Sequence, residues 1–285
     1  MQMTASARVP RHRVRQAGRD AARLRMLLIM LLAGGLQGVC AFDLTEAPDA
    51  FRASQPPASF AVRAAERFAV AQARFATAPT NVTAAWEFAR AAFDCAEFAT
   101  NNTERAALAE QGIAAARQAL TGDSNCAPAH YYLGMNLGQL ARTRTLGALR
   151  LVTDMERAFK AARALDAHFD FAGPDRNLGL LYLQAPSIGS IGDRKKARQH
   201  LQRAVELAPD YPENHLNLAE ALWKWGDRDG ALRAFTALDE IWPQARLRFD
   251  GPDWEAAWAD WTARRGRLDE QLHHALRRER PPKPR

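Results

Sequence analysis

The amino-acid sequence predicts an all-α protein, built as a superhelical array of about four antiparallel helix pairs with a flanking helix at each end. Hydrophobic residues make up 47% and charged residues 25% of the chain, which is ordinary for a soluble globular protein. Alanine is abundant and β-branched residues are sparse, which favours helix over sheet. Large apolar and small residues also recur in units of about 34 residues, a period typical of stacked helix pairs.

The first 41 residues predict an export signal. Residues 1–25 are rich in arginine, and residues 26–36 form the apolar run MLLIMLLAGGL. This run is too short to cross a bilayer comfortably, and small residues follow it as far as Ala41. The order is typical of a cleaved secretory signal peptide, so we expect a periplasmic or otherwise exported protein. The alternatives are an uncleaved membrane anchor and a lipid anchor at Cys40.

The segments on either side of the array differ from it in composition. Residues 42–58 contain three prolines and show little periodicity, which predicts a linker. Residues 59–78 carry apolar residues at helical spacing and predict the flanking helix that starts the array. Residues 277–285 are basic and rich in proline, which predicts a disordered tail. The helical domain is therefore expected to span residues 59–276.

The distribution of charge argues against a nucleic-acid partner. The formal net charge is +7, but seven arginines fall within residues 1–41 and five basic residues fall within 277–285. What remains between these ends is mildly acidic. It shows no basic face of the kind that follows a phosphate backbone.

The repeat is clearest in the unit that starts at Pro212. Large apolar residues stand at unit positions 7, 11 and 24, and small residues stand at positions 8 and 20, where two helix axes approach closely. The large residues are Leu218, Leu222 and Phe235, and the small ones are Ala219 and Ala231. Pro243 stands at position 32 and predicts the end of the second helix. This pattern is typical of tetratricopeptide repeats.

Three earlier units follow the same pattern with decreasing clarity. The unit from Ala172 has Gly179 at position 8, and the unit from Ala127 has Gly134 there. In the earliest unit, Trp86, Ala89 and Phe93 fit the first helix. Residues 184–194 interrupt the third unit with proline and glycine and predict a loop, and such loops on a repeat scaffold often carry function.

The last repeat is expected to be covered by a final helix. Its apolar residues recur at helical spacing and are Trp254, Trp258, Trp261 and Leu268. Packing as a cap on the exposed face of the array is their simplest role.

No motif in the sequence indicates catalysis. We find no metalloprotease, nucleophile-elbow or phosphate-loop pattern and no paired cysteine motif, and we predict a protein that is not an enzyme and has no cofactor or metal site. Cys95 and Cys126 are expected at distant ends of their helices, roughly 20 Å apart. Because a disulfide needs Cα atoms within about 7 Å, both thiols are expected to be free.

The first helices of successive units are expected to line the inner, concave surface of the array. Their inward positions carry a mixture of aromatic, apolar, amide and charged groups, which suits a ligand or peptide with an apolar body and polar ends. The predicted binding residues are Tyr131, Met135, Gln139, Arg176, Leu180, Gln184, Glu220 and Trp223. The alternative is that these side chains face solvent or pack on the terminal helices.

Three stretches in the second half of the array carry a family resemblance. They read GPDRNLGLLY at 173–182, SIGDRKKA at 190–197 and AVELAPDYPENH at 204–215. Together they resemble the T-component family of tripartite ATP-independent periplasmic (TRAP) transporters, most strongly over residues 147–222. The resemblance implies an oligomeric periplasmic accessory protein that docks a solute-binding protein and holds a small apolar, carboxylated ligand in its groove. A general envelope scaffold that binds peptides or proteins is the second hypothesis, and an exported enzyme with an unrecognised site is the third.

Overall fold

The computed structural model describes residues 58–144 and 147–279, and within these ranges all regular secondary structure is helical. The predicted signal peptide and all of the predicted linker except Ala58 lie outside the described residues. The helices are α3 (Ala58–Thr77), α4 (Val82–Ala96), α5 (Asn102–Gly122), α6 (Ala127–Ala141), α7 (Ala148–Leu165), α8 (Phe169–Gln184), α9 (Arg194–Leu207), α10 (Pro212–Lys224), α11 (Arg228–Arg248) and α12 (Glu255–Glu279). None of these helices has the length and apolarity that a membrane span requires.

Short polar side chains fix where several of these helices begin. Asn81 accepts a hydrogen bond from the backbone N–H of Ala84 at the start of α4, and Asn101 caps α5 in the same way. Asp193 and Asp227 cap α9 and α11. Each cap satisfies a backbone donor that the first helical turn leaves without a partner.

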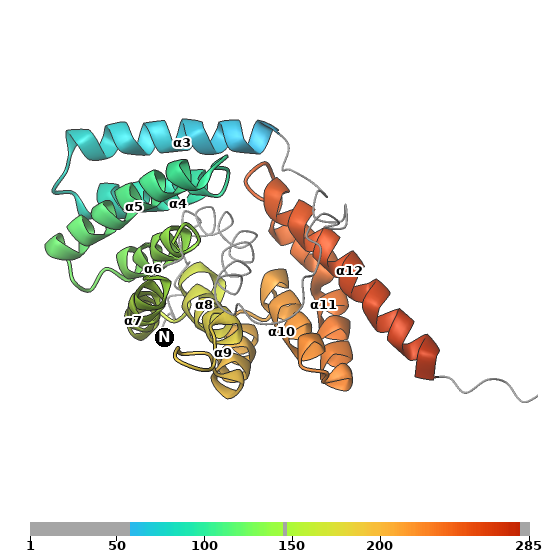
Figure 1. Ribbon diagram of the computed structural model, residues 1–285. Coiled ribbons are helices and arrows are strands. Elements are labelled where there is room, and N and C mark those ends of the chain that lie inside the picture. Colours follow the sequence, from blue (N-terminus) through green and yellow to red (C-terminus); the bar gives the residue numbers. More distant parts are fainter. Residues whose placement is uncertain (1–57, 145–146, 280–285) are drawn as a thin grey trace, which may run out of the picture.

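The helices pack as four antiparallel pairs, α4/α5, α6/α7, α8/α9 and α10/α11. Figure 1 shows the pairs arranged around a common centre, with the first helix of each pair on the inner side. Consecutive first helices also contact one another, and α10 continues this contact with α12. We call α4, α6, α8 and α10 the inner helices. The predicted fold class, an all-α array of four helix pairs with a flanking helix at each end, is confirmed.

Glycine allows the two helices of a pair to approach where the repeat pattern asks for a small residue. A Cβ added at Gly134 would lie 2.6 Å from the Phe159 ring on α7. A Cβ at Gly179 would lie 2.7 Å from Cγ of Leu201 on α9. Both separations are below van der Waals contact, so position 8 of these units has no room for a side chain.

The array contains two large apolar cores that meet near the start of α8. The first core extends from Phe88 on α4 to Leu201 on α9, and the second lies around Tyr211 and Phe249 and includes much of α12. The predicted cap residues Trp254, Trp258, Trp261 and Leu268 are all buried in this second core. Their role as cap packing is therefore confirmed.

Two helix ends differ from the prediction. Pro243 does not end its helix, because α11 continues to Arg248. A proline inside a helix loses one backbone hydrogen bond, but Ala245 in the following turn is buried, and Trp242 packs on Trp258 at a centroid distance of 5.0 Å. At the other end, α12 reaches Glu279 and so takes in three residues of the predicted tail.

The thiols follow the prediction. Cys95 and Cys126 are both free, and no disulfide joins them. Burial raises the pKa of each thiol above its usual value, which disfavours the reactive thiolate.

Candidate functional site

Buried polar side chains connect each inner helix to the next. These contacts occur at three levels, between α4 and α6, between α6, α8 and α10, and between α10 and α12. We call them the polar ladder. Buried polar groups are costly unless they are hydrogen-bonded, so the ladder fixes how the inner helices are placed relative to one another.

The first level joins the end of α4 to the end of α6. The Gln139 amide donates a hydrogen bond to the Glu97 carboxylate, and Arg142 Nη1 donates to Gln139 Oε1 over 3.1 Å. Burial lowers the pKa of Arg142, and the Glu97 carboxylate opposes this effect. The two side chains are almost fully buried as an ion pair, with 3.5 Å between Nη1 and Oε1.

The second level is centred on Arg176 of α8, whose side chain is 1% exposed. Its Nη2 donates to Asp170 Oδ2 over 2.6 Å, and its Nη1 donates to Asn214 Oδ1 of α10 over 3.2 Å. The Tyr131 hydroxyl of α6 donates to the same Asp170 oxygen over 2.6 Å, and it accepts from Asn177 Nδ2 over 3.0 Å. Burial opposes the charge on Arg176, but the Asp170 carboxylate, together with Tyr131, Tyr211 and Glu213, raises the pKa of the guanidinium.

Arg176 also holds a left-handed turn at the start of α8. Asp170, Phe171 and Ala172 have φ values of 51°, 53° and 61°, although none of them is glycine. Left-handed backbone costs an L-residue about 1–2 kcal/mol. Arg176 donates to the carbonyl oxygens of Asp170 and Phe171, and Asn214 donates to that of Phe171 as well.

The left-handed turn joins the two cores. Phe169, just before it, packs against Tyr131 of the first core at a centroid distance of 5.2 Å. Phe171 stacks on Tyr211 of the second core at 4.5 Å. The segment thus carries one aromatic ring into each core.

The third level attaches α12 to α10 through Arg264, whose side chain is fully buried. Its Nη2 donates to Asn217 Oδ1 over 2.5 Å and to Glu220 Oε2 over 2.7 Å. Its Nη1 lies 3.5 Å from Glu213 Oε1 and 3.3 Å from Asp260 Oδ2. Three carboxylates therefore surround one guanidinium, and they raise the pKa of Arg264 against the effect of its burial.

Glu213 is the titratable member of this level. Burial raises the pKa of its carboxyl group to about 7, although the nearby Arg264 and Arg176 act in the opposite direction. Its Oε2 accepts a hydrogen bond from the Trp261 indole over 3.3 Å. The charge of this carboxyl group therefore changes close to neutral pH.

Three buried polar atoms near the second and third levels lack a hydrogen-bond partner among the described residues. They are the amide oxygen of Asn177, the amide nitrogen of Asn217 and the hydroxyl of Tyr211. Both amide orientations are fixed by their other contacts. Asn177 must donate to a tyrosine oxygen that itself donates to Asp170, and Asn217 must accept from Arg264. Asn177 thus retains an unused acceptor and Asn217 an unused donor, each at a fixed position.

All eight predicted binding residues lie on inner helices. Five of them are buried, namely Tyr131, Met135, Gln139, Arg176 and Leu180, and three are half-buried, namely Gln184, Glu220 and Trp223. Four belong to the ladder: Tyr131, Gln139, Arg176 and Glu220. The Met135 sulfur accepts a hydrogen bond from Asn177 Nδ2, and Leu180 lies in the first core. Their role in binding remains a prediction.

The sequence interpretation missed the ladder partners that lie outside the inward positions of the repeat. Asp170 precedes the assigned third unit, and Arg264 lies beyond the last one. A signal for Arg264 is present in the sequence, because this charged residue interrupts the apolar stripe between Trp261 and Leu268. A charge on a buried helix face requires a buried partner.

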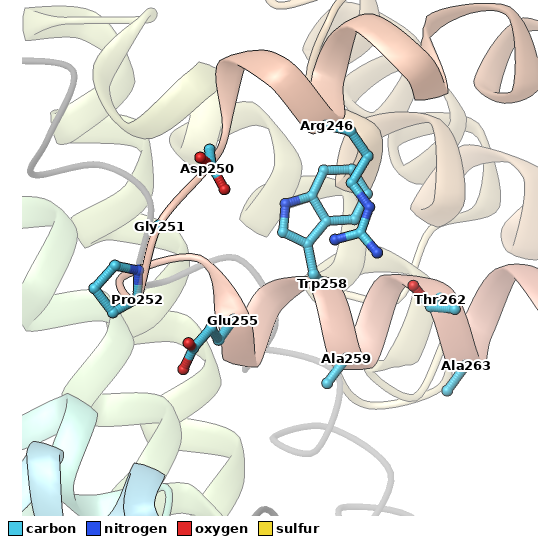
Figure 2. A pocket seen from close by; sticks show the side chains of 9 residues that line it. All are labelled: Arg246, Asp250, Gly251, Pro252, Glu255, Trp258, Ala259, Thr262 and Ala263. Carbon is cyan, nitrogen blue, oxygen red and sulfur yellow. The ribbon is translucent and has the colours of Figure 1, made fainter.

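A separate groove of about 660 Å³ lies outside the ladder, where α11 ends and α12 begins. Figure 2 shows its lining, in which the Arg246 guanidinium lies over the Trp258 ring, 4.1 Å from the ring centroid. The lining residues are Arg246, Asp250, Gly251, Pro252, Glu255, Trp258, Ala259, Thr262 and Ala263. Within the described part of the chain, no cluster of histidine, cysteine and acidic side chains is arranged to hold a metal ion.

Comparisons with known proteins agree with the helical-repeat fold. Residues 192–248 match a tetratricopeptide-repeat family model, and residues 62–148 match the model of the regulator of microtubule dynamics protein 1–3 family. Neither match covers half of the chain. A search of curated proteins finds no match.

Two solved structures are similar. One is TTC0263, a thermophilic tetratricopeptide-repeat protein from Thermus thermophilus, with a TM-score of 0.52 and 18% identity over 66% of this chain and 89% of that chain. The other is MamA, with a TM-score of 0.45 and 19% identity over 62% of this chain and 87% of that chain. The TTC0263 likeness supports the fold. The chain is thus a tetratricopeptide-type helical array.

Proposed function

We propose that this protein is an exported, non-catalytic scaffold that binds a protein partner through its inner helices. Tetratricopeptide-type arrays generally act as protein–protein interaction scaffolds, and helical-repeat arrays use an extended concave surface for binding. The observation that carries the proposal is that three predicted binding residues on the inner helices, Gln184, Glu220 and Trp223, stay partly exposed on a tetratricopeptide-type array.

The chemistry of these three side chains favours a polypeptide. Their amide, carboxylate and indole groups offer both hydrogen-bond donors and acceptors. A peptide backbone offers a matching N–H donor and C=O acceptor in every unit.

A free carboxylate is a weaker match to the same surface. Each of the three ladder arginines, Arg142, Arg176 and Arg264, already forms an ion pair with a carboxylate of the chain. An anionic ligand would have to displace one of these carboxylates and leave it buried without its cation. We therefore place the protein partner ahead of the apolar carboxylated ligand that the family resemblance implies.

The finer proposal is that the partner is a periplasmic solute-binding protein of a TRAP-type transporter. It rests on the resemblance of residues 147–222 to the T-component family, and export rests on the pattern of residues 1–41. The loop between α8 and α9 supports a docking role, because Ile188 at its tip is 91% exposed. Backbone hydrogen bonds from Gly192 and Asp193 to the carbonyl oxygens of Pro186 and Tyr182 hold this loop against the end of α8.

The experiment is purification of the protein from the envelope of its own cells, followed by native mass spectrometry. We expect a complex with a solute-binding protein. Recovery of envelope-assembly proteins in its place would favour the alternative of a general envelope scaffold, and a protein recovered only in the cytoplasm would contradict export.

Two matched variants test the role of the loop. Ile188→Ser is expected to reduce the recovered complex at least tenfold, because it removes an exposed apolar contact. Leu165→Ser, at a residue on α7 that is 41% exposed, is expected to leave the complex unchanged. Equal recovery of the complex from both variants would remove the loop from the interface.

A further inference from the structure

The first and last described helices meet although they are distant in the sequence. Arg63 Nη2 of α3 lies 2.7 Å from Glu255 Oε2, and Arg67 Nη2 lies 3.0 Å from Asp253 Oδ1 at the start of α12. The two contacts join residues that are 192 and 186 positions apart. Figure 1 shows α3 extending from the first helix pair to the beginning of α12, so that it closes the array into a ring.

The two halves of α3 are held differently. The second half packs on the first repeat, where the rings of Phe68 and Phe75 lie 5.3 and 5.5 Å from that of Phe88. Arg74 forms an ion pair with Glu87 of α4 at the same end. The first half extends from this anchor toward α12.

No described apolar core crosses the junction between α3 and α12. The first core includes Phe68 and Phe75 of α3 but no residue of α12, whereas the second core includes much of α12 but no residue of α3. Two ion pairs join the helices across this junction. We call Arg63, Arg67, Asp253 and Glu255 the clasp.

The clasp has the properties of a contact that opens easily. Its side chains are 29–53% exposed. An exposed ion pair contributes little to stability, and salt screens it because the Debye length is about 8 Å at physiological ionic strength. The two arginines stand one helical turn apart, and the two acids stand at a helix N-terminus, where the helix dipole favours negative charge.

We propose that α3 is a strap whose clasp opens and closes the ring, and that opening admits a protein segment to the inner helices. The anchor at Phe88 stays in place while the first half of α3 moves away from α12. The proposal that a protein segment enters the ring rests on the proposed function. The opening itself is a property of the isolated chain.

The groove beside the clasp indicates which segment would open it. Glu255 belongs to the clasp and also lines the groove, where Asp250 adds a second carboxylate and the Trp258 face already accepts a guanidinium. A lysine or arginine of the partner that enters the groove competes with Arg63 for the Glu255 carboxylate. The partner segment is therefore expected to carry a basic side chain.

The opening is measured on the full chain by pulsed electron paramagnetic resonance. Spin labels are attached through non-natural amino acids at Val62 and Thr262, which are both exposed, so the cysteines stay unchanged. We expect one short distance at low salt and a longer distance that gains population toward about 1 M NaCl. Arg63→Glu is expected to populate the longer distance at every salt concentration.

The charge-swapped double variant Arg63→Glu/Glu255→Arg is expected to restore the short distance. The matched control is Arg157→Glu, which breaks an exposed ion pair with Asp154 on α7 and is expected to change nothing. A distance that stays the same across salt concentrations and in Arg63→Glu would overturn the strap. If Arg63→Glu lengthens the distance and the charge-swapped double variant does not shorten it again, the electrostatic clasp is overturned.

A second measurement separates this inference from the proposed function. Once a partner has been captured, its association rate is compared between the unchanged chain and Arg63→Glu. We expect at least a threefold faster rate for Arg63→Glu, because the ring is already open. Equal rates would overturn gating by the clasp and leave partner binding intact, whereas the distance measurement stands even where no partner is found.

Discussion

At the scale of single residues, the inner surface is organised by buried charge. Arg176 and Arg264 each bring several polar groups from different helices to one guanidinium. Arginine suits this role because it stays charged and offers five donors in a planar fork. Such a site specifies how helices are placed, since any other arrangement leaves a charge buried without its partners.

Removal of the Arg176 guanidinium is expected to be strongly destabilising. Arg176→Met takes away the cation bound by Asp170 and the donor to two carbonyl groups of the left-handed turn. Loss of one member of a buried ion pair costs about 3–5 kcal/mol, and urea denaturation measures the change in the free energy of unfolding. The control Arg203→Met, which breaks an exposed pair with Glu206, should cost less than about 1 kcal/mol.

A double-mutant cycle separates the charge of Asp170 from its backbone role. Asp170→Asn in the Arg176→Met background removes the buried charge, and asparagine tolerates the left-handed region. We expect the double variant to recover about half of the stability that Arg176→Met loses. No recovery would mean that the ion pair itself contributes little.

The raised pKa of Glu213 predicts how stability depends on pH. The folded protein holds this proton up to about pH 7, whereas the unfolded chain releases it near 4.5. The folded state therefore binds more protons between these values, and the free energy of unfolding falls as pH rises through this window. The loss is on the order of 3 kcal/mol, because one pKa unit corresponds to about 1.4 kcal/mol.

Glu213→Gln tests this dependence directly. The variant keeps the shape of the side chain but cannot titrate, so its free energy of unfolding should fall less than that of the unchanged protein between about pH 4.5 and 7.5. Glu240→Gln, at an exposed residue of α11, is the matched control and should follow the unchanged protein. Parallel pH curves for all three proteins would contradict a near-neutral pKa at Glu213.

At the scale of helices and turns, the sequence was informative where spacing decides the structure. The small residues at position 8 predicted close helix contacts, and Gly134 and Gly179 make them. The left-handed turn at Asp170–Ala172 was not predictable, because Phe171 and Ala172 disfavour that backbone and the contacts that hold it come from α8 and α10. The helix end predicted at Pro243 was wrong for a related reason. The packing of the residues that follow Pro243 outweighs the local preference of proline to end a helix.

A pair of glycine variants tests the close contacts. Gly179→Ala should destabilise the array by about 1–3 kcal/mol, because its Cβ would lie 2.7 Å from Leu201. Gly266→Ala on α12 meets no atom within 4 Å and should stabilise the protein by about 0.5–1 kcal/mol through helix propensity. Thermal unfolding of both variants checks the opposite signs. Equal melting temperatures would mean that position 8 is not a tight contact.

At the scale of the whole molecule, repeat periodicity predicts the array but not its closure. A periodic pattern describes how each helix pair contacts its neighbours, whereas the clasp joins residues about 190 positions apart. The candidate site was likewise predicted only in part. The inner helices were predicted from unit positions, but Asp170 and Arg264 enter the site from segments outside those positions.

The proposed function requires that the inner helices bind a protein partner. Site-specific photo-crosslinking in the protein's own cells tests it most directly, with the crosslinking residue placed at Trp223 on the inner helix α10 or at Leu232 on α11 as an outer control. We expect a protein crosslink from position 223 and none from position 232. A crosslink from position 232 alone, or from neither position, would contradict it.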